Sequence, residues 1–101
     1  MDVEVIKAEV ARRYEVSVEQ LEGERREKHI SQARHIAIYL ARELTNGSFP
    51  AIGKAFGARD HTTVMHACRK VSELLKTPLF RSEIEELKEC LRTSQRASTG
   101  R

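Results

Sequence analysis

Residues 61–75 constrain the fold most, because their apolar side chains recur with the period of an α-helix. At about 100° of rotation per residue, the apolar positions within one arc are Val64, Ala67, Cys68, Val71, Leu74 and Leu75. The positions on the opposite side are Thr62, Met65, His66, Arg69 and Glu73. This separation predicts an amphipathic helix with a buried stripe and an outward polar face.

Three further segments carry apolar stripes with the same period. Their positions are Val3, Ile6, Val10 and Tyr14, then Ile36, Ala37, Leu40, Ala41 and Leu44, and last Phe80, Ile84, Leu87 and Leu91. A chain of 101 residues rich in Ala, Leu, Glu, Lys and Arg has room for one domain and favours helix. We therefore expect one all-α domain over residues 1–92, and a disordered tail over residues 93–101, which carry no stripe.

Capping residues indicate where these helices begin and end. Side chains that can accept from the first backbone N–H groups of a helix are those of Asp2, Ser17, Ser48 and Asp60, with Gln20 completing a capping box. Asn46-Gly47 and Gly57 supply residues that commonly end helices. A short helix after Ser48, a turn containing Gly57 and a helix after Asp60 together predict a helix-turn-helix.

The segment "EGERREKHIS", residues 22–31, is polar and has no helical period. We expect a basic surface loop that presents Arg25, Arg26 and Lys28, followed by a helix that begins near Ser31. The loop belongs to the most basic part of the chain. Residues 25–70 hold 9 basic and 3 acidic side chains, whereas residues 1–24 hold 3 and 7. A run of charge is usually a solvated face, but here it coincides with the predicted helix-turn-helix.

The second helix of a helix-turn-helix enters the DNA major groove with its N-terminus first. Short polar or methyl-bearing side chains suit that position, and the chain provides Asp60, His61, Thr62 and Thr63. Side chains one and two turns further along meet phosphates instead, and these are His66, Arg69 and Lys70. The pattern predicts a DNA-binding surface, although Asp60 alone could be a simple N-cap and the threonines ordinary first-turn residues.

Catalytic and metal-binding alternatives lack the residues that they need. His61 and His66 lie about 140° apart on a helix, and no Glu or Cys completes a zinc site. The Gly-Lys pair in "GKAFG" lacks the earlier glycine and the following Ser or Thr of a phosphate-binding loop. Cys68 and Cys90 have no metal-knuckle spacing and are expected to be buried free thiols. We expect no catalytic residue, no metal and no cofactor in this chain.

The segment "AFGARDHTTVMHACRKV" resembles the signature of the C-terminal DNA-binding domain of DnaA, the bacterial chromosomal replication initiator, and "ARELTNGSFPAIGKAFG" extends the similarity upstream. The resemblance covers roughly residues 3–92. It implies a helical domain that binds double-stranded DNA at the asymmetric DnaA boxes of a replication origin. It also implies that ATP binds only to an AAA+ domain that this chain lacks.

The resemblance assigns DNA contacts to individual residues. It implies an arginine in the minor groove, which is Arg26 unless the flanking Glu24 and Glu27 shift the role to Arg25. The base contacts that it implies in the major groove are Asp60, His61, Thr62 and Thr63, with apolar contacts from Phe49 and Pro50. The backbone contacts are Arg25, Lys28, Arg34, Arg42, Thr45, Asn46, His66, Arg69 and Lys70. Ala33 replaces a proline that is common in the family.

The resemblance also sets expectations about partners. We expect an isolated, monomeric C-terminal domain that works in the cytoplasm at the nucleoid and meets other initiator molecules through domains not present here. No apolar run approaches the roughly 20 residues that cross a bilayer. Two other functions stay open: a protein-interaction domain whose outer surface docks a regulator, and a transcription or transposition factor with the same helix-turn-helix. Phosphate binding would separate the first of these by its steep salt dependence.

Overall fold

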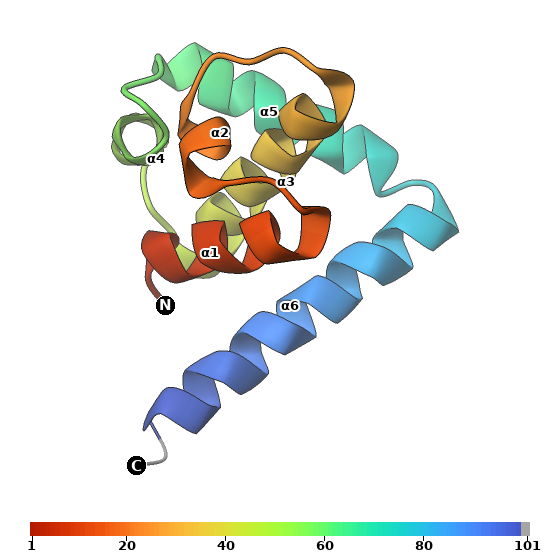
Figure 1. Cartoon of the computed structure of the whole chain (residues 1–101). Helices are drawn as coiled ribbons and strands as arrows, with labels where there is room; N and C mark the ends of the chain where they lie inside the picture. The colour runs from red at the N-terminus through yellow and green to blue at the C-terminus, as the bar shows by residue number, and fades with distance from the viewer. Residues whose placement is uncertain (100–101) are drawn as a thin grey trace.

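The chain folds into a bundle of short helices with one longer helix laid across it (Figure 1). In the computed structural model, which describes residues 1–99, the helices are α1 (Val3–Tyr14), α2 (Val18–Glu22), α3 (Lys28–Thr45), α4 (Phe49–Ala55), α5 (His61–Leu74) and α6 (Pro78–Thr99). No strand occurs among these residues. The expected all-α class is confirmed.

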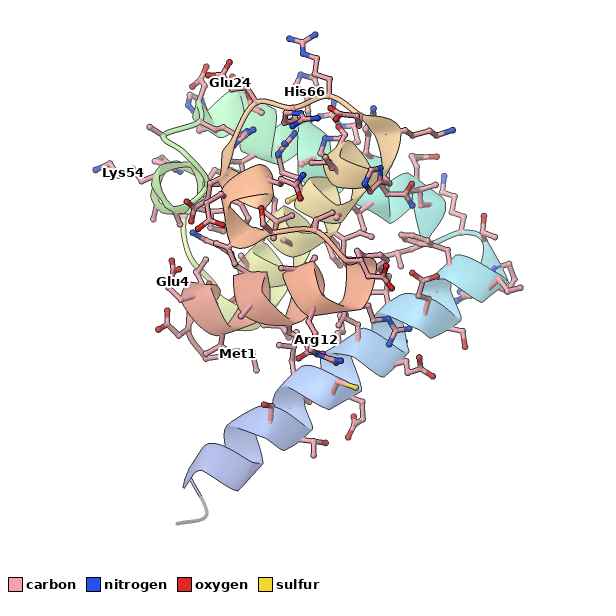
Figure 2. All side chains as sticks on the ribbon, viewed as in Figure 1. Met1, Glu4, Arg12, Glu24, Lys54 and His66 are labelled. Atoms are coloured by element: carbon pink, nitrogen blue, oxygen red, sulfur yellow. The ribbon has the colours of Figure 1, made fainter. Side chains whose placement is uncertain are left out.

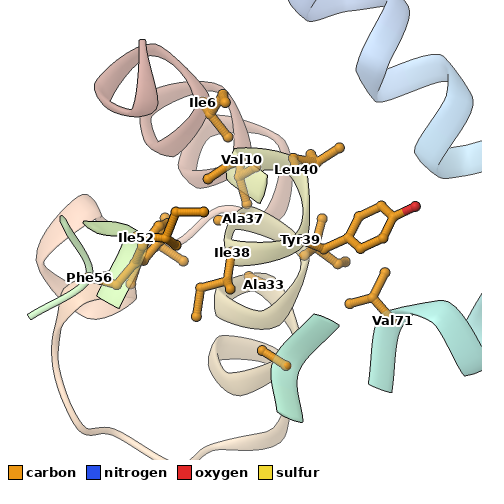
Figure 3. Packing of buried hydrophobic residues seen from close by; sticks show 14 of the residues in the cluster. Ile6, Val10, Ala33, Ala37, Ile38, Tyr39, Leu40, Ile52, Phe56 and Val71 are labelled. Atoms are coloured by element: carbon orange, nitrogen blue, oxygen red, sulfur yellow. The ribbon is translucent and has the colours of Figure 1, made fainter. Parts of the chain in front are cut away.

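Helix α3 is the centre of the core, and α1, α2, α4 and α5 pack around it (Figure 3). Its buried side chains include Ile36, Ala37 and Leu40, all of which are fully excluded from solvent. Ile52 and Phe56 cover α3 from the α4 side, while Val64, Ala67 and Val71 cover it from α5. Each fully buried aliphatic or aromatic side chain contributes about 1.5–3 kcal/mol. This packing holds α4 and α5 in a fixed relation to α3.

The predicted capping residues lie at the helix starts. The Asp2 side chain accepts from the backbone N–H of Glu4 at 3.2 Å, and Ser48 accepts from that of Ala51 at 3.2 Å. Ser17 and Gln20 form the complete capping box. Asn46 ends α3 in the left-handed region at φ 56°. These local predictions are confirmed because capping depends on neighbours in the sequence.

Lys7 is a buried cation that joins three helices. Its Nζ donates to Glu22 Oε2 in α2 at 2.6 Å and to the carbonyl of Ala55 in α4, and it lies 3.0 Å from Glu4 Oε2. Burial lowers the pKa of Lys7, but the hydrogen bonds to Glu22 and Glu4 outweigh it, so the pKa is raised. Lys7 therefore stays charged and holds α2 and α4 beside α1.

Three local predictions differ from the structure. Helix α3 begins at Lys28 rather than near Ser31, because Ile30 is 1% exposed and draws the first turn onto the core. Leu74, predicted in the buried stripe of α5, is 39% exposed at the end of that helix. Cys68 packs against the core, but Cys90 is exposed and so is not a buried thiol.

Helix α6 packs beneath α1 through Ile84, Leu87 and Leu91 (Figure 1). The Tyr14 hydroxyl donates to Glu83, and Arg13 Nη2 donates to Glu86 Oε1 at 2.8 Å, so polar contacts flank the apolar ones. The helix continues to Thr99, into the segment expected to be a disordered tail. The reason is that backbone hydrogen bonds can extend a helix beyond its last buried residue. The end of that segment, residues 100–101, lies outside the described residues.

Candidate nucleic-acid interface

Helices α4 and α5 and the turn between them form the predicted helix-turn-helix. The Arg59 backbone N–H donates to the carbonyl of Gly53 at 2.8 Å, which brings the turn against α4. A Cβ atom on Gly53 would overlap the Arg59 carbonyl, so only glycine permits this approach. Gly57 has a φ of +81°, the left-handed region that glycine tolerates best. The turn thus fixes the start of α5 relative to α4.

The predicted base-contacting residues lie at the start of α5 and face solvent. Asp60, His61, Thr62 and Thr63 are all exposed. Asp60 occupies the N-cap position, but its side chain makes no capping hydrogen bond. It accepts instead from Thr62 Oγ1 at 2.8 Å and lies 3.1 Å from His61 Nδ1. The hydrogen bond from Thr62 lowers the pKa of Asp60, which keeps this carboxylate charged as an acceptor.

A groove of about 850 Å³ separates the outer face of α5 from the start of α3 and the loop before it. Six predicted DNA contacts line it: Arg26, Lys28, Thr63, His66, Arg69 and Lys70. Figure 2 places His66 of α5 and Glu24 of the loop at the same edge of the molecule. The structure therefore brings together residues that are up to 44 positions apart in the sequence, from Arg26 to Lys70.

The two neighbouring arginines of the loop, residues 23–27, have different surroundings. Arg25 Nε donates to Glu27 Oε1 at 3.1 Å, and its Nη2 pairs with the other oxygen of Glu27. This hydrogen bonding raises the pKa of Arg25 and lowers that of Glu27. Arg26 lines the groove and forms no ion pair within the described part of the chain. Of the two arginines, only Arg26 is among the residues that line the groove.

A second group of predicted contacts lies at the turn between α3 and α4, away from the groove. Arg42 Nη1 donates to the carbonyl of Gly47 at 2.7 Å, and its guanidinium stacks 4.2 Å from the centroid of the Phe49 ring. Thr45 Oγ1 donates to the carbonyl of Ala41 within α3 at 2.6 Å and accepts from the backbone N–H of Gly47 in the turn at 3.2 Å. These contacts hold the turn together. The remaining predicted residues here, Asn46 and Pro50, are exposed.

Arg34 differs from its predicted role as a DNA-backbone contact. It is 6% exposed, and its guanidinium donates to the carbonyls of Leu21 at 3.0 Å and Gln20 at 2.8 Å. Burial lowers the pKa of Arg34, and the positive charge of Arg59 lowers it further. The guanidinium of Arg34 is bound by groups inside the protein. We therefore correct its assignment: Arg34 holds α2 against α3 and is not a phosphate contact.

Gln32 and His35 line the groove but were not predicted as site residues. They follow Lys28 by four and seven positions, which is the spacing of one helix face. The signal was hidden because the sequence placed the start of α3 near Ser31. Burial lowers the pKa of His35, and the charges of Lys70, Arg34 and Arg59 lower it further.

The described residues contain no cluster of three or more potential metal ligands. Among the helices described, none combines the length and apolar character that crossing a bilayer requires.

Residues 3–71 match the family described as the bacterial dnaA protein helix-turn-helix. This chain belongs to that DnaA family. It is 48% identical over 91 residues to the chromosomal replication initiator protein DnaA of Levilactobacillus brevis, a match that covers 89% of this chain and 20% of the relative. The DnaA of Enterococcus faecalis is 46% identical over 87 residues, covering 85% of this chain and 20% of the relative.

A solved structure of a DNA replication initiation factor has a similar fold. It superposes with a TM-score of 0.79 at 37% identity, covering 88% of this chain and 27% of the other. The chain therefore spans about a fifth of the length of the curated DnaA relatives that it matches.

Proposed function

We propose that this chain is a sequence-specific module that binds double-stranded DNA at the DnaA boxes of a bacterial replication origin. The observation that carries the proposal is the groove that places Arg26 of the loop opposite the polar face of α5. DNA offers two neighbouring grooves separated by a phosphate backbone, and a cationic surface between two reading elements suits that shape. Membership of the DnaA family supports the same function.

In this proposal α5 enters the major groove with its N-terminus first. Asp60 and His61 meet base edges, the methyl groups of Thr62 and Thr63 meet thymine methyls, and Phe49 and Pro50 add apolar contacts. Arg26 enters the adjacent minor groove, where a narrow A·T stretch concentrates negative potential.

The phosphates between the two grooves meet side chains from the loop, α3 and α5. The residues that make these contacts are Arg25, Lys28, His66, Arg69 and Lys70. A second set of phosphate contacts lies at the turn between α3 and α4 and consists of Arg42, Thr45 and Asn46. No chemical step is required of any residue, and we propose that ATP and other initiator molecules bind elsewhere in a longer protein. We further propose that this domain is monomeric by itself and acts at the nucleoid.

A binding titration tests the proposal. The chain is titrated against an intact DnaA box and a scrambled duplex of equal length at two salt concentrations. We expect tighter binding to the intact box, and a decrease in both affinities with salt of about 0.9 log unit per log unit for each phosphate neutralised. Equal affinity for both duplexes would contradict sequence-specific binding. Weak binding with no salt dependence would instead favour a domain that docks a protein.

A further inference from the structure

The C-terminus of α2, from which the loop departs, is enclosed by two arginines. The last carbonyl groups of a helix have no partner within it. Arg34 takes two of them, those of Gln20 and Leu21. Arg59 takes the next two: its Nη1 donates to the carbonyl of Glu22 at 3.2 Å and its Nη2 to that of Gly23. Four successive carbonyls are thus satisfied by two side chains.

The two arginines come from different elements. Arg34 belongs to α3, whereas Arg59 precedes the N-cap of α5 and also donates to the carbonyl of Phe56 within its own turn. Burial lowers the pKa of Arg59 as it does that of Arg34, but an arginine remains charged in proteins. The negative end of the α2 dipole and the carbonyl oxygens compensate these two cations. Arg59 therefore connects the start of the loop directly to the turn that precedes α5, through a charged side chain.

Close backbone packing accompanies this connection. A Cβ atom on Gly57 would overlap the carbonyl of Glu22 and would lie 3.3 Å from Arg59 Nη1. The turn before α5 and the end of α2 are therefore in direct contact, with the Arg59 guanidinium beside them. A rigid contact at this point fixes the distance from the first residue of the loop to the first residue of α5.

We propose that Arg59 is a positioning residue for DNA recognition: it sets the place of the loop relative to the N-terminus of α5, so that Arg26 and the residues Asp60–Thr63 engage adjacent grooves together. Arg59 itself does not touch DNA. This inference rests on the proposed function, because it assumes that Arg26 reads the minor groove.

A double-mutant cycle tests the inference. In the parent protein, Arg26→Ala is expected to weaken binding to an intact box by roughly five- to a hundredfold, the range of one base contact. In an Arg59→Ala background the same change is expected to weaken binding less than about threefold, because the two residues are coupled. Thr62→Ala is expected to lower discrimination equally in both backgrounds, because α5 remains in place. Circular dichroism checks that each variant keeps its helices.

Lys54→Ala is the matched control, because Lys54 is an exposed cation of α4 that points away from the body of the molecule (Figure 2). It removes one positive charge without touching α2, so Arg26→Ala should keep its full effect beside it. Arg59→Lys keeps the charge but replaces the planar fork of donors with a single ammonium group on a flexible stem, which does not hold the carbonyls of two segments in a fixed geometry. It replaces Arg59→Ala in the cycle if that variant does not fold, and should reduce the Arg26 effect in part.

Two results would overturn the positioning role. One is an Arg26→Ala effect that is the same size in the parent and in every folded Arg59 variant. The other is an Arg59→Lys variant that loses the Thr62 effect along with the Arg26 effect, since Arg59 would then support the whole domain rather than the loop. If Arg26→Ala has no effect in the parent, the proposed minor-groove contact fails first and the positioning role fails with it.

Discussion

At the scale of single residues, Glu27 pairs with Arg25, a residue that we propose contacts a DNA phosphate. Both oxygens of Glu27 are paired with the Arg25 guanidinium, and both side chains are exposed. An exposed ion pair of this kind contributes little to stability, because water and salt screen it. A phosphate could therefore displace Glu27, but the carboxylate opposes the approach of the phosphate by its own negative charge.

Glu27→Gln should strengthen binding to intact and scrambled duplexes alike and make the salt dependence steeper by about one phosphate contact. Titrations at several salt concentrations measure both quantities. Glu24→Gln is the control, because Glu24 is an acidic neighbour in the same loop with no ion pair to Arg25. An equal gain from both variants would mean that net charge alone matters and that releasing Arg25 has no effect of its own.

Thr62 and Arg69 test whether base recognition and phosphate binding are carried by different residues of α5. Thr62→Ala should lower discrimination at one thymine-containing position by about 1–3 kcal/mol while leaving non-specific binding nearly unchanged. Arg69→Ala, two turns further along, should weaken all duplexes alike and make the salt dependence shallower by about one contact. Both residues are exposed, so neither variant should melt differently from the parent. Equal weakening of intact and scrambled sites by Thr62→Ala would place the reading residues elsewhere.

At the scale of helices, the sequence could predict what depends on neighbours along the chain. The stripes of α1, α3 and α5 and the capping residues Ser17 and Ser48 are local signals, and they placed the helix-turn-helix correctly. The start of α3 was predicted wrongly because Ile30 is a single apolar residue in a polar segment. The structural roles of Arg34 and Arg59 could not be predicted for a different reason. Their partners are backbone carbonyls at the end of α2, and no local sequence pattern identifies a backbone group as a partner.

Gly53 tests how closely the two helices of the helix-turn-helix must approach. A methyl group at this position would overlap the carbonyl of Arg59, which is backbone and cannot rotate away. Gly53→Ala should therefore destabilise the domain by about 1–3 kcal/mol, as overpacking usually does, despite the better helix propensity of alanine. Urea unfolding measures the change. Lys54→Ala, an exposed neighbour on α4, should leave stability within about 0.5 kcal/mol of the parent. A Gly53→Ala protein as stable as the parent would show that the turn can open.

At the scale of the whole molecule, His35 links stability to pH. Its pKa lies below the ordinary value of 6.5 because burial, Lys70, Arg34 and Arg59 all oppose its charge. The folded state therefore binds fewer protons than the unfolded chain as pH falls below 6.5, so stability decreases in that direction. Thermal unfolding should show a lower melting temperature at about pH 5 than at pH 7.5, and His35→Gln should reduce the difference. An unaltered pH dependence in His35→Gln would exclude His35 as its source.

The boundary of the folded unit can be tested at α6. Among the side chains of this helix that the structure describes, Leu91 is the last that belongs to the core. Removing residues 93–101 should therefore change stability by no more than about 0.5 kcal/mol, whereas Leu91→Ala should cost about 2–5 kcal/mol. Calorimetry or urea unfolding measures both. A large loss on truncation would mean that the core contacts of α6 extend beyond Leu91.

The enclosed end of α2 has a consequence for the rates of binding. Because the four carbonyls from Gln20 to Gly23 are already paired, the start of the loop is held in position before any DNA is bound. The association rate should then depend on diffusion and on the attraction between the basic side chains and the phosphates. Ordinary protein encounters have rate constants of about 10⁵–10⁷ M⁻¹s⁻¹, and electrostatic attraction makes them faster. Loosening that root would shorten the time that the domain remains on its site and would leave its arrival almost unchanged.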